Sequence, residues 1–372
     1  FLAQRYQNLT IASSPYERLP SLSINHSDEY ENFNGFLNVE TVLGMSLTQF
    51  ERNHNFVASS TDKNITGTRF IVNPSIAVPF EKSYGYIKPK LMMNIRKYEL
   101  EGGSTNSKSM AIPTLSVDSG VYLDKEVDFG GLSYTQTLEP RIFYSYTPYK
   151  NQEALPLFDT ALTDLNLESL FIENQFVGGD RVMDSNQLTL AATTRFIDDK
   201  GYERLNATIA QRYYMSDRKV LQETQYKNSV FQSDSSDLFL TATAYVNKAM
   251  KVSSAIQYNP DESTTNRATF KTRYSPHPGK LIDASYRLIR NPTDSNNDIK
   301  QINLAGQWPI GQGWYTIGRY NYDIKQSRVV ESLGGLEFDG GCWSSRLVLN
   351  RLALATTEKP NYTLFIQIEL GG

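Results

Sequence analysis

Apolar and polar residues alternate with a period of two from one end of the 372-residue chain to the other. In residues 85–98, for example, Ile87 and Leu91 are apolar at odd positions, whereas Lys88 and Arg96 are polar at even positions. Because successive side chains of a β-strand point to opposite faces of the sheet, each such stretch predicts a strand with one apolar face and one polar face. The predicted fold class is therefore all-β and antiparallel.

About 18 segments show this pattern, and most reach the roughly 9–11 residues that a tilted membrane-spanning strand requires. The predicted strands are 2–10, 19–27, 35–51, 66–80, 84–99, 110–123, 130–146, 185–197, 202–215, 236–247, 249–258, 266–275, 280–290, 299–309, 313–323, 328–339, 342–354 and 361–370. Short connections such as 81–83 alternate with longer, more polar ones such as 52–65 and 216–235. Short periplasmic turns and longer extracellular loops are typical of outer-membrane barrels, so we predict a transmembrane antiparallel β-barrel.

Composition excludes several other classes. No run of 18 apolar residues is present, so no membrane-spanning helix is expected. The formal net charge of -3 does not favour nucleic-acid binding, which requires a basic surplus. A single cysteine, Cys342, excludes a disulfide framework within these residues and a cysteine-based zinc site. Catalytic, metal-binding and cofactor-binding motifs are not found, so we expect no enzymatic activity, no metal and no cofactor.

Several segments together resemble one known family. The motifs, in chain order, are YERLP at 16–20, LEPR at 138–141 with Tyr149 and PLFD at 156–159, GGDRV at 178–182, SNQL at 185–188, QWP at 307–309, GRYNY at 318–322 and LEFDGGCW at 336–343. They are similar to the C-terminal barrel of the LptD family, the lipopolysaccharide-assembly proteins of the Gram-negative outer membrane. The resemblance runs from about Tyr6 to Leu370.

The resemblance implies a translocon that inserts lipopolysaccharide into the outer leaflet. Its barrel would have about 26 strands, so residues 1–372 would form the C-terminal portion, and the first strands and an N-terminal jelly roll would lie outside this chain. An LptE-type plug lipoprotein would occupy the lumen, and a periplasmic LptA-type bridge would deliver lipopolysaccharide through the jelly roll. The remaining partners would be the lipids of the outer membrane.

A barrel that transports lipopolysaccharide would need an openable seam. The sugar head cannot cross hydrocarbon, because each unsatisfied polar group there costs several kcal/mol. In the family, the head passes through the lumen and the lipid leaves between the first and last strands. The last predicted strand, 361–370, would be that seam. Its lipid-facing residues would be Tyr362, Leu364, Ile366, Ile368 and Leu370, unless it is an ordinary closing strand.

The connection 147–184 is predicted to be a long extracellular loop, and it is too apolar for disorder. We expect it to fold over or into the barrel mouth and to pack on the plug, although a loop that packs only on itself is the alternative. Asp180 and Arg181 could fix it through charge-assisted hydrogen bonds. The residues predicted for this loop site are Phe158, Asp159, Phe171, Asp180 and Arg181.

Cys342 stands at the start of a strand, next to a short turn that we place on the periplasmic side. The family carries two adjacent cysteines here, which form disulfides with the N-terminal domain, as the oxidising periplasm allows. In this chain Gly341 replaces the first of them, so only a bond from Cys342 to a cysteine outside the chain is expected. A buried unpaired thiol is the alternative.

Two other functions remain open from the sequence. A general diffusion porin of about 18 strands would explain the strand count alone. A barrel enzyme would need its histidines, His26, His54 and His277, to converge in space with other groups, which sequence does not reveal.

Overall fold

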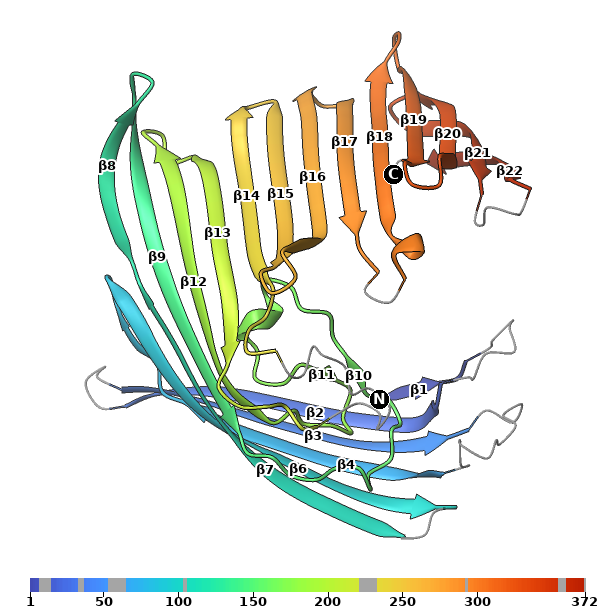
Figure 1. Ribbon diagram of the computed structural model, residues 1–372. Coiled ribbons are helices and arrows are strands. Elements are labelled where there is room, and N and C mark those ends of the chain that lie inside the picture. Colours follow the sequence, from blue (N-terminus) through green and yellow to red (C-terminus); the bar gives the residue numbers. More distant parts are fainter. Residues whose placement is uncertain are drawn as a thin grey trace. The chain divides into compact units, whose positions relative to one another are not determined.

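A computed structural model describes residues 1–6, 15–32, 37–52, 65–102, 106–220, 233–291, 294–353 and 359–370. Twenty strands form one sheet and two more form a small second sheet (Figure 1). Helical turns in this part of the chain are the 3-10 segments η2 (Ser169–Phe171) and η4 (Ser295–Asn297). Among the described residues, no helix is long and apolar enough to cross a bilayer. The prediction of an all-β, antiparallel chain is confirmed.

The strands are β1 (Leu2–Gln4), β2 (Glu17–Asn32), β3 (Leu37–Glu51), β4 (Thr66–Ala77), β5 (Phe80–Lys82), β6 (Gly85–Glu101), β7 (Ser107–Val121), β8 (Leu123–Phe129), β9 (Leu132–Thr147), β10 (Ala161–Leu162), β11 (Phe176–Val177), β12 (Ser185–Asp198), β13 (Glu203–Tyr214), β14 (Leu238–Asn247), β15 (Met250–Asn259), β16 (Thr264–His277), β17 (Lys280–Ile289), β18 (Ile299–Pro309), β19 (Trp314–Asp323), β20 (Arg328–Asp339), β21 (Trp343–Leu352) and β22 (Asn361–Leu370). Neighbours along the chain pair antiparallel, as in β2 with β3 and β21 with β22. β9 pairs with β12, so the chain leaves the large sheet between them to form β10 and β11.

Each predicted strand overlaps one of these, and the sheet has two more strands than expected. β5 is separate because Pro79 has no N–H to donate, so the ladder from β4 to β6 stops at Ala77 and resumes at Phe80. β8 was not predicted, because its charged residues obscure the apolar and polar alternation. It runs up to a turn at Gly130 and Gly131, whose φ angles of 61° and 76° suit glycine.

Some predicted segments extend outside the described residues. This applies to the end of strand 2–10, the start of strand 35–51, the last residue of strand 342–354, and to parts of the connections 52–65, 100–109, 216–235, 291–298 and 355–360.

The chain divides into two compact units. The first contains Phe1–Leu123, Glu139–Ala191 and Gln211–Ser236. One face of its sheet exposes apolar side chains such as Phe70, Leu91 and Leu115. The other face carries polar pairs and is covered in large part by residues 148–184, which we call the β9–β12 segment (Figure 1).

The second unit contains Asp124–Leu138, Ala192–Ala210 and Asp237–Gly372. Its strands β14 to β22 form a regular meander in which cross-strand partners share a face. Leu304 pairs with Tyr320, and both are exposed on the apolar face. Asp283 pairs with Arg273 on the polar face. Period-two alternation therefore gives this unit two chemically different faces, as the sequence predicted.

Candidate functional site

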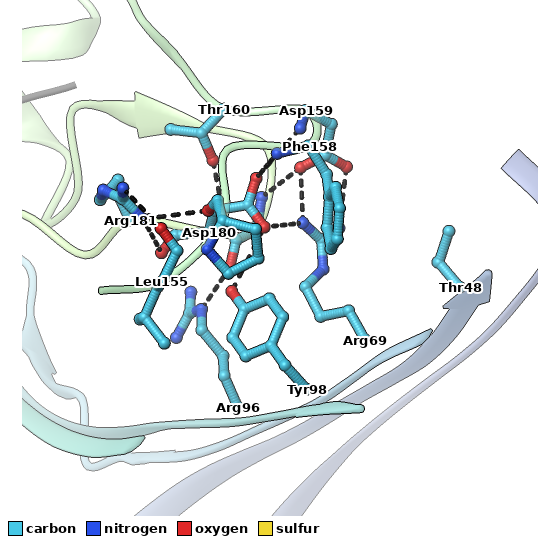
Figure 2. A network of polar contacts seen from close by, with 12 residues as sticks. Thr48, Arg69, Arg96, Tyr98, Leu155, Phe158, Asp159, Thr160, Asp180 and Arg181 are labelled. Atoms are coloured by element: carbon cyan, nitrogen blue, oxygen red, sulfur yellow. Dashed lines mark hydrogen bonds and ion pairs between the residues drawn. The ribbon is translucent and has the colours of Figure 1, made fainter. Parts of the chain in front are cut away.

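The β9–β12 segment is anchored to the first unit's sheet by a buried ionic centre. Arg69 of β4 donates from Nη1 to Asp159 Oδ1 at 2.6 Å and to Asp180 Oδ1 at 2.7 Å. Its Nη2 donates to Asp159 Oδ2 at 2.8 Å. Figure 2 shows the guanidinium between the two carboxylates, which the motifs PLFD and GGDRV supply. One strand cation thus holds two loop motifs that lie about 20 residues apart in sequence.

Asp180 is the hub of this centre, and its side chain is fully buried. Its Oδ2 accepts the backbone N–H groups of Phe158 at 2.7 Å and Asp159 at 3.0 Å. Its Oδ1 accepts Arg69 and, at 3.2 Å, the hydroxyl of Tyr98 from β6. Four donors therefore compensate the desolvation of one carboxylate, which is the condition under which a buried charge is stable.

Asp159 is less buried and adds a second cation. Its Oδ1 accepts the N–H of Gly179 at 3.0 Å, and its Oδ2 accepts Arg18 of β2 at 3.2 Å. Burial alone would raise the pKa of Asp159, but the hydrogen bonds and charge of Arg69 outweigh it and hold the pKa below its usual 3.8. The carboxylate form is thus the one that docks the segment.

Two glycines let the segment approach the sheet. Gly178 has a φ of 80°, a left-handed conformation that other residues adopt with strain. A Cβ atom at Gly179 would lie 2.5 Å from Arg69 Cζ and 2.5 Å from Ile71 Cδ1. The carbonyl of Gly179 accepts Arg96 Nε at 2.5 Å. Gly179 is therefore required by the close contact with β4, and Gly178 by its left-handed backbone beside Asp159.

Arg181 forms its hydrogen bonds within the β9–β12 segment. Its guanidinium donates to the carbonyls of Leu155 and Pro156, each at 3.1 Å. Burial lowers the pKa of Arg181. The backbone of Val182 is held by Gln152, whose amide accepts at 2.9 Å and donates at 2.7 Å. The predicted charge-assisted bonds of Asp180 and Arg181 are present, but Asp180 pairs with Arg69 and Arg181 bonds to carbonyls.

Aromatic packing surrounds the ionic centre. Phe158 stacks on Phe50 of β3 with ring centroids 4.4 Å apart and meets Tyr16 edge-on at 4.9 Å. The cluster contains Phe50, Tyr98, Leu100, Met110, Ile112, Leu155, Phe158 and Val182. Loop and strand residues thus form one apolar core on the polar side of the sheet.

Phe171 lies in a second contact, at η2. Its ring is 6.2 Å from Phe143 and lies under the guanidinium of Arg141 at 3.9 Å. The carbonyl of Ser169 accepts the fully buried Arg212 at 2.8 Å, and the carbonyl of Leu170 accepts Thr189 at 2.7 Å. This end of the segment is therefore fastened to β12 and β13.

Sequence reasoning identified the loop residues but missed their partners. Phe158, Asp159 and Asp180 converge around Arg69, Arg181 bonds to carbonyls of the segment, and Phe171 lies at the separate η2 contact. Arg69 and Tyr98 were not singled out, because strand residues of the polar face look alike in sequence, and Arg18 was noted only as part of the motif YERLP, without a role. The acids of the segment form no metal cluster in the described part of the chain.

The predicted seam strand, β22, lies at an edge of the described sheet. It pairs with β21, and all its residues are exposed. Ile366 and Leu364 are opposite Leu347 and Leu349, so Tyr362, Leu364, Ile366, Ile368 and Leu370 share the apolar face with β21. Gln367 and Glu369 lie on the other face, together with Phe365, which breaks the alternation.

Cys342 is exposed in the turn between β20 and β21. Burial of the thiol, the alternative considered from sequence, is therefore wrong. Gly341 next to it has a φ of 84°, a left-handed conformation that shapes the turn.

A family model described as LptD, LPS transport system D, matches residues 1–314. The chain is 35% identical over its full length to the LPS-assembly protein LptD of Aromatoleum aromaticum, of which it covers 45%. It is 36% identical, again over its full length, to that of Chromobacterium violaceum, of which it covers 46%. This chain belongs to the LptD family. It spans about half the length of the curated relatives it matches.

Membership of the LptD family places the chain in the Gram-negative outer membrane, whose multi-pass proteins are antiparallel β-barrels. The family description names a transport system and not an enzyme, and it does not favour the porin interpretation. Among solved structures, the chain is similar to the siderophore receptor PirA from Acinetobacter baumannii, with a TM-score of 0.46 and 9% identity over 96% of this chain and 64% of that one.

Proposed function

We propose that this chain is the C-terminal barrel portion of an outer-membrane translocon that inserts lipopolysaccharide into the outer leaflet. The sugar head passes along the polar side of the strands, inside the lumen, and the lipid leaves at β22. The observation that carries the proposal is the LptD match along the whole chain. An N-terminal jelly roll, with the first barrel strands, completes the protein and receives lipopolysaccharide from an LptA-type periplasmic bridge.

The properties of β22 support its role as the seam. Its apolar side chains are 60–81% exposed from Leu364 to Leu370 on the face shared with β21, which suits contact with acyl chains. Gln367 of the same strand lies opposite Arg346 on the polar face, which suits contact with the sugar. An edge strand with both kinds of side chain can release a molecule whose two halves prefer different solvents.

The β9–β12 segment is proposed to be an extracellular loop that forms part of the plug-contact surface for an LptE-type lipoprotein. Phe158, Asp159, Phe171, Asp180 and Arg181 fix its shape through contacts within this chain. Exposed residues such as Glu168 are free to face the plug. Cys342, exposed in its turn, is proposed to form a disulfide with a cysteine of the jelly roll.

Time-resolved photo-crosslinking tests the seam. A photoreactive residue replaces Ile366 on β22 of the full-length protein, or Ile302 on β18 as the control, since both are exposed on the apolar face. Newly synthesised, pulse-labelled lipopolysaccharide is expected to crosslink at position 366 before it crosslinks at position 302. Equal timing, or earlier labelling at 302, would show that lipid does not leave at β22. Surface lipopolysaccharide that persists after depletion of the protein would refute the transport function itself.

A further inference from the structure

We propose that the polar face of β15, β16 and β17 binds phosphate groups on the sugar head of the transported glycolipid. This inference deepens the proposed function and depends on it. Five exposed cations lie on this face, and they are Lys251, Arg267, Lys271, Arg273 and Arg287. Asp283 is the single carboxylate within the three strands Met250–Asn259, Thr264–His277 and Lys280–Ile289.

The strand register brings the cations together. Arg267, Lys271 and Arg273 occupy odd positions of β16, so they share one face and span about 20 Å at roughly 3.4 Å per residue. Lys251 of β15 is directly opposite Arg273. Arg287 of β17 is directly opposite Thr269 and therefore lies beside the gap between Arg267 and Lys271. The result is a continuous basic surface on a chain whose formal net charge is -3.

This arrangement is unfavourable for the sheet itself. Like charges directly opposite each other, as Lys251 and Arg273 are, destabilise a strand pair. Asp283 compensates Arg273 through bonds of 2.8 and 2.9 Å, and Arg267 has a partner within the chain, but Lys251, Lys271 and Arg287 share this face as well. Arg287 donates to the neutral amide of Gln301 at 2.8 Å, and Lys251 lies 5.2 Å from the ring of Tyr245. A cluster that costs stability is explained by an anionic ligand that it binds.

The chemistry of the side chains favours phosphate. Arginine presents paired N–H donors that match two phosphate oxygens, and lysine adds a point charge. A surface about 20 Å long can contact phosphates on more than one sugar. Because the side chains are exposed, each contact is weak, which suits a ligand that must move on rather than remain bound.

Photo-crosslinking at Thr269, between Arg267 and Lys271, tests the proposal in the full-length protein with its natural partners. The probes are purified lipopolysaccharide and the same material after enzymatic removal of its phosphates. The test variant combines Arg267→Gln, Lys271→Gln and Arg287→Gln. The matched control combines Ser253→Gln and Ser285→Gln, which flank Lys271 on the same face without a change of charge.

Crosslinking of the phosphorylated glycolipid is expected to fall roughly tenfold in the test variant, since three exposed charge contacts are lost. The control is expected to resemble the unmodified protein, and the dephosphorylated glycolipid is expected to resemble the test variant. If the triple variant fails to insert, Lys271→Gln alone should still lower crosslinking about twofold.

Equal crosslinking of both glycolipids, or crosslinks to an acidic partner protein alone, would overturn the proposal. An absence of crosslinks to either glycolipid would overturn it as well. Surface lipopolysaccharide is measured in the same cells, so a wrong assignment of this basic surface, with transport intact, is distinguished from failure of the proposed function.

Discussion

Substitution of Asp180 by asparagine should release the β9–β12 segment from the sheet while the strands stay folded. Asparagine has nearly the shape of aspartate, but it is neutral and offers one acceptor oxygen in place of two. The carboxylate now accepts Phe158 N–H and Asp159 N–H on one oxygen, and Arg69 and Tyr98 on the other. In either orientation of the asparagine side chain, its NH2 group faces two donors.

The loss in the free energy of docking is set by the donors that Asp180→Asn leaves without an acceptor. Leaving a buried donor unsatisfied costs about 1–3 kcal/mol, and removing one partner of a buried ion pair costs about 3–5 kcal/mol. Asp159 continues to neutralise Arg69, so the lower part of that range applies. We expect the free energy of docking to fall by about 3 kcal/mol.

Hydrogen exchange of backbone amides measures this loss. Gly179 and Val182 are suitable reporters, because their N–H groups bond to Asp159 and Gln152 and not to Asp180. Their exchange should accelerate by about two orders of magnitude, whereas that of β6 should not change. The control is Glu153→Gln, which removes the same charge from an exposed position of the segment. Unchanged exchange at Gly179 and Val182 in Asp180→Asn would refute the hub role.

Three further predictions concern other contacts. Gly179→Ala should undock the segment in the same exchange assay, because its Cβ would lie 2.5 Å from Arg69 Cζ. The control Gly130→Ala should leave the segment docked, because open space surrounds this turn. Docking should weaken as the pH falls below about 4, because the pKa of Asp159 is lower in the docked state than in the undocked state. The contribution of Asp159 to the free energy of docking is complete above the pKa of the undocked state and is lost as the pH falls through the pKa of the docked state. An Asp159→Asn variant with the same pH dependence of docking would argue against this. Cys342→Ser should abolish any reducible link between this chain and the N-terminal domain on non-reducing gels, and a link that survives the substitution would contradict the proposed disulfide.

The strands were predictable because their signal is local. Each strand shows apolar and polar residues in alternation with a period of two, and this pattern alone is enough to assign Ile366 and Gln367 to opposite faces of β22. β5 and β8 escaped because Pro79 interrupts one strand and charged residues fill the other. The first effect acts at a single residue and the second at several charged ones, and a periodic pattern takes account of neither.

The site was predictable only in part, because its contacts are distant in sequence. The motif residues Asp159 and Asp180 stood out, but their partner Arg69 lies 90 and 111 residues away. No pattern in β4 distinguishes Arg69 from other polar-face residues. The reason for glycine at position 179 also becomes visible only when β4 is placed beneath it.

Nitroxide scanning along β17 tests most directly the claim that the two faces of these strands contact two different solvents. Labels are placed one at a time from Leu281 to Leu288 in the full-length protein in lipid bilayers, with Cys342 replaced by serine. Labels at Ile282, Ala284, Tyr286 and Leu288 should be accessible to oxygen dissolved in lipid, and labels at Leu281, Asp283, Ser285 and Arg287 should be accessible to a water-soluble nickel chelate. The same accessibility at odd and even positions would contradict the account.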